Sequence, residues 1–335
     1  MKVSRVFKGL AGPVLESPRI VVIGANGQTT TRAVRDMQPG ELPDYYEGDQ
    51  IMVLGEYVGD KPVTLRIEGT VRGRAATFEV PLDPANASVR HDYVPRLWAM
   101  RRIAALIDQV RQAGADGGAS INDARMKELS DEIVHLSMKF GVLTEYTAFL
   151  AKEETKFGVR GDFQSRGRDV SNELRRRASG VRQGAGAVNQ EANINNLKSA
   201  GMPMSSAPSR VATGGRGGAT GSAPAADALG DLAGAPAQSK DKQQYFDENL
   251  KKVEVSSIRQ VGNQAFYNRQ NRWVDARILD KETEKPDRTV VFGTPEYVTL
   301  AEELARTNEQ HLLAQEGDIL LQVGKDRVLV QMVAP

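Results

Sequence analysis

Two amphipathic segments dominate the hydrophobic pattern of the chain, and both lie between residues 93 and 140. In the first, apolar residues recur at roughly helical spacing up to Gly114. In the second they step by three, four, three and four positions and share one stripe of a helix; they are Met126, Leu129, Ile133, Leu136 and Phe140. Gly114 and Gly141 follow the last apolar positions, where a left-handed cap favours glycine. The pattern predicts two helices, followed by a short strand over residues 146–151.

Upstream of this helix pair, short runs rich in apolar residues are typical of strands. Turn dipeptides such as Asn26-Gly27 separate them, and the expected strands cover residues 19–25, 29–34, 50–58, 62–70 and 75–80. In the fourth run Val63, Leu65 and Ile67 alternate with polar residues, which indicates a sheet with one face in water. We therefore predict one domain over residues 13–153, a β-sandwich accompanied by the helix pair.

The next segment, residues 154–244, has the composition of a linker. Within residues 199–239, 29 of 41 residues are Gly, Pro, Ala or Ser, and none is aromatic. Such a sequence cannot bury enough apolar surface to offset its chain entropy, so we expect a flexible, basic tether. Two segments inside it, 170–182 and 185–199, are candidate helices that would be marginally stable alone.

The last segment, residues 245–335, predicts a small α+β domain. Strands are expected at residues 254–260, 264–267, 272–279 and 289–292, with a hairpin formed by 318–323 and 326–332. Thr294 and Pro295 form a favourable helix start, with a threonine cap and proline at the first helical position. The fold class predicted for the whole chain is α+β, mainly β.

The composition excludes several kinds of chemical site but does not indicate a class of partner. The chain has no cysteine, which removes disulfides, thiolate nucleophiles and cysteine-ligated zinc. It contains no apolar run long enough to span a membrane, and residues 1–18 lack the apolar core of a signal peptide. Its net charge of +1 indicates no class of partner.

Candidate catalytic and ligand-binding motifs are weak. The three histidines, His91, His135 and His311, lie far apart in the sequence, whereas zinc sites and catalytic triads need converging imidazoles. The glycine-containing run at residues 24–31 lacks the lysine of a phosphate-binding loop. We therefore expect no catalytic, cofactor-binding or metal-binding residues, and no cofactor.

Three runs in and after the helix pair carry a family resemblance: Leu97-Trp98-Ala99, Glu128-Leu129 with Asp131-Glu132-Ile133-Val134, and Phe140-Gly141-Val142-Leu143-Thr144-Glu145-Tyr146-Thr147. They resemble the segment that follows the von Willebrand factor type A domain in inter-alpha-trypsin inhibitor heavy chains and their bacterial relatives, the VIT/VWA proteins, of which the bacterial branch is the closer match. The resemblance covers residues 1–153. It implies that residues 1–12 are a remnant of the last type A helix, and that the type A domain with its metal-binding loop is missing from this chain.

The resemblance implies a non-enzymatic module for protein binding, cell adhesion or assembly, from the C-terminal part of a VIT/VWA protein at the cell envelope or outside the cell. Its partner would be a protein, either an upstream type A domain or a second copy of the chain. The candidate interface residues are Val3, Val6, Phe7, Leu10, Tyr45, Tyr46, Tyr267 and Trp273. Trp273, in an alternating strand, fits a core position equally well.

Two alternatives come from other functional classes. A hydrolase would need a serine or paired-acid site between the two domains, and no spacing in the sequence supports one. Weak binding to nucleic acid or to an anionic surface would use the basic linker; the arginines concerned are Arg166, Arg168, Arg175, Arg176 and Arg177. Specific nucleic-acid recognition is not expected, because few aromatic residues lie near these arginines.

Overall fold

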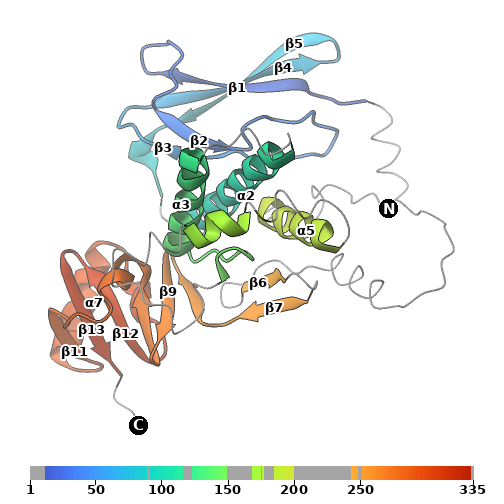
Figure 1. The fold of residues 1–335 in the computed structure, drawn as a ribbon. Helices are drawn as coiled ribbons and strands as arrows, with labels where there is room; N and C mark the ends of the chain where they lie inside the picture. Colours follow the sequence, from blue (N-terminus) through green and yellow to red (C-terminus); the bar gives the residue numbers. More distant parts are fainter. Residues whose placement is uncertain are drawn as a thin grey trace. The chain divides into compact units, whose positions relative to one another are not determined.

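The computed structural model describes residues 12–88, 91–115, 123–148, 168–174, 176, 185–199, 243–247 and 251–332. It divides into two compact units, with the boundary between Val94 and Pro95 (Figure 1). Among the described residues, the first unit comprises 12–88 and 91–94, and the second comprises those from Pro95 onward. Helices and strands both contribute, so the predicted α+β class is confirmed.

The first unit is built on an antiparallel sheet of three strands in the order β1-β4-β5 (Figure 1). The strands are β1 (Glu16–Gly24), β4 (Val63–Val71) and β5 (Arg74–Leu82). The β4–β5 hairpin turns at Arg72 and Gly73, whose φ angles are 51° and 75°. A two-residue hairpin whose twist matches its strands needs positive φ at both positions, and glycine supplies the second without strain.

A second pair of strands, β2 (Val34–Gln38) and β3 (Leu54–Tyr57), completes this unit. Val34 of β2 packs with Val22 and Val63 of the three-stranded sheet in a small core. The predicted strand at residues 29–34 is wrong, because bends fill residues 31–33 and the strand begins only at Val34.

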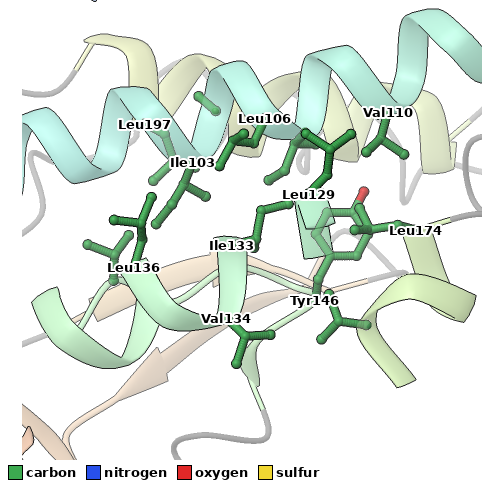
Figure 2. Close-up of a cluster of buried hydrophobic side chains, with 14 of the residues drawn as sticks. Ile103, Leu106, Val110, Leu129, Ile133, Val134, Leu136, Tyr146, Leu174 and Leu197 are labelled. Atoms are coloured by element: carbon green, nitrogen blue, oxygen red, sulfur yellow. The ribbon is translucent and has the colours of Figure 1, made fainter. Parts of the chain in front are cut away.

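In the second unit, the predicted helix pair is confirmed as α2 (Val94–Ala115) and α3 (Asp123–Phe140). Figure 2 shows Ile103 and Val110 of α2 directed toward Leu129 and Ile133 of α3, and all four are buried. The predicted strand at 146–151 is wrong over its described part, because residues 145–147 form a turn in which the Thr144 backbone N–H donates to the hydroxyl oxygen of Thr147.

Two segments of the predicted linker fold against this helix pair. Helix α5 (Ala185–Ser199) contributes Ile194 and Leu197 to the buried core, and the helical segment at 168–174 contributes Val170 and Leu174. The helix predicted at 185–199 is therefore confirmed. The expectation that this segment belongs to a flexible tether is corrected, because its apolar residues are buried by the helix pair.

Polar side chains of α5 add ion pairs and hydrogen bonds to neighbouring elements. Arg111 Nη1 of α2 pairs with Glu191 Oε2 at 3.0 Å, and Lys198 pairs with Asp108 of α2. The Asn193 side chain bonds in both directions with the backbone of Phe246 in β6 (Gln243–Phe246), through Nδ2 to O at 2.9 Å and Oδ1 to N at 3.0 Å. Strand β6 pairs in turn with β7 (Lys252–Val255).

The C-terminal part is a six-stranded mixed sheet in the order β11-β13-β12-β10-β9-β8 (Figure 1). Its strands are β8 (Ile258–Val261), β9 (Gln264–Arg269), β10 (Arg272–Asp275), β11 (Arg288–Val291), β12 (Asp318–Val323) and β13 (Asp326–Gln331). Helix α7 (Pro295–Arg306) begins where the sequence predicted, with the Thr294 hydroxyl accepting from the Tyr297 backbone N–H. Its buried Leu300 and Leu304 cover the sheet.

The predicted strand at 272–279 ends early, at Asp275. The carboxylate of Asp275 accepts from the backbone N–H of Arg277 and so caps the 3-10 helix η4 (Ala276–Lys281). Another 3-10 helix, η5 (Gln310–Leu313), follows α7 and buries Leu312 and Leu313.

The helix pair belongs to the same compact unit as the C-terminal sheet. The buried Tyr267 hydroxyl of β9 donates to the carbonyl oxygen of Met138 in α3, and Leu143 shares a core with Val274 and Leu320. The sequence had instead placed this helix pair in one domain with the N-terminal strands. Local patterns define the helices but do not say which sheet covers them.

Candidate interaction surface

Strand β5 exposes three apolar side chains in the first unit. Phe78, Val80 and Leu82 keep 50%, 47% and 37% of their surface accessible. They occupy alternate positions and so point to one face of the sheet. Side chains of this size are seldom exposed together without a partner, so the strip they form is the candidate interaction surface of the described residues.

The strip is exposed because the cover of the sheet is incomplete. On the same face, Val63 and Leu65 of β4 lie opposite Leu82 and Val80. Val63 is buried by the core that includes β2, whereas Leu65 is only partly buried and the three β5 side chains lie outside that core. The apolar face thus extends beyond the part that the second strand pair covers.

Strand β5 is also an edge strand within the described part of the first unit, because it follows β4 at the end of the sheet. Pro81, opposite Thr64, has no backbone N–H to donate to β4. Directly opposed residues alternate between hydrogen-bonded and non-hydrogen-bonded pairs. The backbone groups of Ala75, Thr77 and Glu79, which are in phase with Pro81, therefore point away from β4.

On β4 and β5 the opposite face of this sheet is polar, and cross-strand ion pairs lie on it. Arg66 Nη2 lies 2.7 Å from Glu79 Oε1, and Arg19 Nη2 lies 2.8 Å from Glu68 Oε2. These pairs are largely exposed, so each contributes little to stability. On β5 the large apolar side chains therefore lie on the face opposite to these ion pairs.

The structure places two of the predicted interface aromatics in the first unit. Tyr46 is 38% exposed. Tyr45 is half-buried, and its backbone forms an isolated bridge with Leu15, in which the Tyr45 N–H donates to the Leu15 carbonyl over 3.0 Å. Val3, Val6, Phe7 and Leu10 lie outside the described residues.

The other two predicted interface aromatics are corrected, because both are core residues. Tyr267 keeps 1% of its surface and Trp273 keeps 7%. Burial raises the pKa of Tyr267 well above its usual range. The guanidinium of Arg259 covers the Trp273 ring, with its central carbon 4.3 Å from the ring centre. Neither ring is available to a partner.

The predicted anion-binding arginines are only partly described. Arg176 forms a two-point pair with Glu173, through Nη2 to Oε1 at 2.7 Å and Nε to Oε2 at 2.9 Å. Arg168 is exposed. Arg166, Arg175 and Arg177 lie outside the described residues. No cluster of arginines is therefore assembled from the two that are described.

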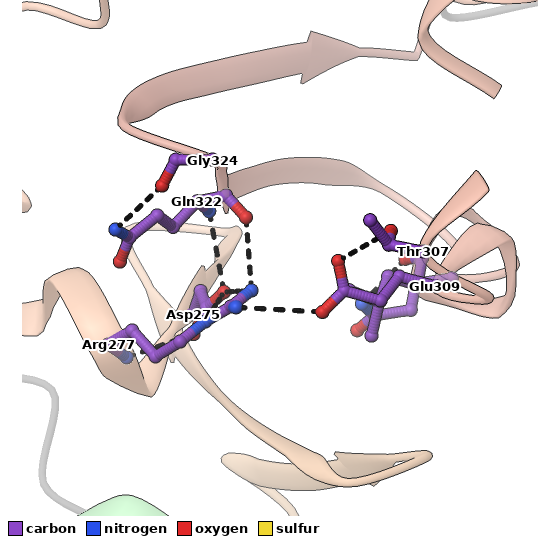
Figure 3. A network of polar contacts seen from close by, with 8 residues as sticks. Asp275, Arg277, Thr307, Glu309, Gln322 and Gly324 are labelled. Carbon is purple, nitrogen blue, oxygen red and sulfur yellow. Dashed lines mark hydrogen bonds and ion pairs between the residues drawn. The ribbon is translucent and has the colours of Figure 1, made fainter. Parts of the chain in front are cut away.

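A polar network in the second unit is a structural joint (Figure 3). The buried Asp275 carboxylate accepts from Arg277 Nη2 at 2.6 Å and Nε at 2.9 Å, and from the Gln322 backbone N–H at 3.4 Å. Arg277 also donates to the Gln322 carbonyl at 3.0 Å and pairs with Glu309 at 3.7 Å. The network joins β10, η4, β12 and the start of η5. Its groups are directed at one another and carry no catalytic arrangement.

Other features of the described residues favour no catalytic centre. Across these ranges, no group of three or more His, Asp or Glu side chains is placed to hold a metal ion. Partial desolvation, and next the charge of Lys139, lower the pKa of His135 on α3. No helix within the described part is both long and apolar enough to cross a membrane.

Sequence reasoning found strand β5 but missed the exposure of Phe78, Val80 and Leu82. The available signal was Pro81, because proline inside a strand is confined to edges and bulges. An edge strand with apolar residues at alternate positions is an unusual combination, and natural proteins protect such edges.

Comparison with known proteins gives weak and partial similarity. The inter-alpha-trypsin inhibitor heavy chain H3 of Mus musculus is 21% identical over 154 residues, which cover 43% of this chain and 16% of that protein. The protein of the same name from Rattus norvegicus is 26% identical over 130 residues, covering 35% of this chain and 14% of that protein. The chain thus spans about a sixth or less of these relatives. No family profile and no solved structure matches it.

Proposed function

We propose that the chain is a non-enzymatic protein-binding module of the VIT/VWA type, used in adhesion or assembly, and that β5 forms its contact surface. The observation that carries this proposal is the exposure of Phe78, Val80 and Leu82 on an edge strand. Burying them against a partner removes apolar surface from water, which is the main favourable contribution to most protein association.

The similarity to inter-alpha-trypsin inhibitor heavy chains supports this class of function. The finer features belong to the proposal: a bacterial VIT/VWA origin, residues 1–12 as a type A remnant, a location at the cell envelope or outside the cell, and a protein partner. Tyr46 extends the candidate contact residues of the first unit.

Neither alternative gains support from the described residues. The buried acid Asp275 is fully engaged by Arg277 and Gln322, so it offers a hydrolase no free carboxylate. The carboxylate of Glu173 partly neutralises Arg176, one of the two described arginines proposed to contact anions. The apolar β5 strip is a feature of protein contacts rather than of nucleic-acid contacts, which are polar and strongly basic.

The proposal is tested with variants of the full chain. Partners captured from the native source by the immobilised wild-type chain are identified, and their affinity is then measured for wild type, Phe78→Ser/Val80→Ser and Phe292→Ser. Phe292 is the matched control, because it is 51% exposed in the second unit. We expect the double variant to lose at least tenfold in affinity and the control to retain it. Equal affinity of wild type and the double variant would refute the proposal.

A further inference from the structure

Among the described residues, no strand pairs with the outward edge of β5, which lies beside the apolar strip. Because Ala75, Thr77 and Glu79 direct their backbone groups away from β4, a neighbouring strand could bond to them. We infer that β5 binds an extended segment of a different polypeptide by strand addition, an inference that rests on the proposed function. In this binding mode main-chain hydrogen bonds supply affinity and alternate side chains supply specificity.

The side chains of β5 define the apolar pattern of such a segment. Phe78 and Val80 continue the apolar face that Ile67 and Leu65 begin on β4. An added strand places every second residue on that same face. The bound segment must therefore alternate, with apolar residues next to Phe78 and Val80 and polar residues on the other face.

The charges on the polar face define one polar position of the segment. On this face an arginine twice lies directly opposite a glutamate of the neighbouring strand. Arg19 of β1 is opposite Glu68 of β4, and Arg66 of β4 is opposite Glu79 of β5. Half of the Glu79 side chain remains exposed at the edge. Opposite charges on facing residues stabilise a strand pair. A lysine or arginine opposite Glu79 therefore continues the alternation.

Residues 1–11 of the same chain do not have this pattern. Their branched and aromatic apolar residues fall at positions 3, 6, 7 and 10. In a strand, Val3 and Phe7 would lie on one face with Arg5 between them, while Val6 and Leu10 would lie on the other. This spacing suits a helix, so the segment cannot present a continuous apolar face to β5.

A second copy of β5 is also a poor partner. The residues of β5 with outward backbone groups are Ala75, Thr77 and Glu79, and Pro81 is in phase with them. None is basic, so no self-pairing places a cation opposite Glu79. Pro81 would add no N–H to the ladder. Neither residues 1–11 nor a second β5 has this pattern, and we assign the edge to a segment of another protein. Residues 156–160 of the chain, Lys-Phe-Gly-Val-Arg, do alternate, so tighter peptide binding after their deletion would also overturn the inference.

The test uses a labelled nine-residue peptide of alternating threonine and valine, with lysine at its central polar position, and measures its binding to the full chain by fluorescence anisotropy. A peptide with glutamate in place of lysine is the charge control. We expect the lysine peptide to bind about two- to fivefold more tightly, the range that cross-strand charge pairs give. In Glu79→Gln this preference disappears.

Backbone bonding is tested separately from side-chain contact. In an antiparallel added strand with lysine opposite Glu79, N-methylation at the lysine and at the nearest threonine removes N–H groups that face β5. N-methylation at two valines removes N–H groups that face away. The first change should weaken binding at least tenfold and the second should leave it intact. Thr77→Pro should act like the first and Thr77→Ala like the second, since proline is tolerated at this phase of an edge strand.

The outcomes separate this inference from the proposed function. If Phe78→Ser/Val80→Ser abolishes binding of the natural partner while the N-methylated lysine peptide binds like its unmodified form, the surface is correct and strand addition is wrong. If the double variant changes neither binding reaction, both proposals fail. Tighter peptide binding after deletion of residues 1–11, or a wild-type dimer that Thr77→Pro abolishes, would assign the edge to the chain itself and overturn the inference.

Discussion

The hydroxyl of Tyr267 on β9 donates a hydrogen bond to the carbonyl oxygen of Met138, over 2.9 Å. Met138 lies in the last turn of α3, where helical carbonyls have no partner within the helix. The same hydroxyl lies 3.2 Å from the carbonyl oxygen of Ser137. Tyr267, 129 positions from Met138 in the sequence, thus donates a hydrogen bond to the last turn of α3 and joins this helix to the C-terminal sheet.

Tyr267→Phe should destabilise the second unit. It keeps the ring but removes one donor to the carbonyl of Met138, which retains the Gly141 backbone N–H at 3.4 Å, so we expect a loss of about 0.5–1.5 kcal/mol. Urea denaturation measures the change, with Tyr46→Phe as the exposed control that we expect to stay within about 0.5 kcal/mol of wild type. Equal unfolding midpoints for Tyr267→Phe and wild type would show that this bond does not stabilise the unit.

Helix α5 should be held by its apolar residues rather than by its ion pairs. Ile194→Ala removes a buried side chain and should cost about 2–5 kcal/mol. Val188→Ala, at an exposed position of the same helix, should have little effect. Hydrogen exchange over residues 185–199 measures whether the helix opens. Unchanged exchange in Ile194→Ala would contradict the packing described for α5.

Helices α3 and α5 show which features of the fold the sequence can predict. The stripe from Met126 to Phe140 has a clear helical period, and residues 185–199 avoid proline and contain good helix formers, so both elements could be located. The partner of α5 could not be predicted, because the residues that bury Ile194 come from distant parts of the chain. Tyr267 fits an interface or a core equally well in an alternating strand, and only the position of α3 decides between them.

Asp275→Asn should weaken the joint between β10 and β12. The change removes the charge that receives Arg277, and hydrogen bonds to charged groups contribute about 1.5–3 kcal/mol. Asp280→Asn, at an exposed position of η4, is the control. Thermal unfolding compares the variants. If both lower the unfolding temperature equally, the buried network is not the source of the stabilisation.

Acid should weaken the pair of Asp287 and Arg327. Hydrogen bonds from the Arg327 side chain and backbone lower the pKa of Asp287 from 3.8 to about 2. Since the folded-state pKa is the lower one, the contribution of this pair is complete above the unfolded pKa and is lost as pH falls through about 2. The stability difference between wild type and Asp287→Asn should therefore be constant near neutral pH and shrink below about pH 4.

Chemical denaturation of wild type and Asp287→Asn between pH 6 and pH 2 measures this dependence. Asp280→Asn again serves as the control, at an exposed aspartate outside the ion pair. A difference between wild type and Asp287→Asn that grows as the pH falls would contradict the assigned role of Arg327.

For the interaction surface, the sequence could predict the strand but not its exposure. The sequence predicted a strand at residues 75–80, in which Phe78 and Val80 stand at alternate positions. It could not predict that the cover ends before β5, because that depends on how far β2 and β3 reach across the sheet. A pattern gives the two faces of a strand, whereas its exposure depends on neighbouring elements.

The central claim, that β5 is the contact surface, is tested most directly by hydrogen–deuterium exchange of the full chain with and without its captured partner. The account predicts slower exchange in the bound state for peptides that cover residues 74–82, with α7 unchanged. Unchanged exchange over 74–82, together with protection elsewhere in the chain, would contradict it.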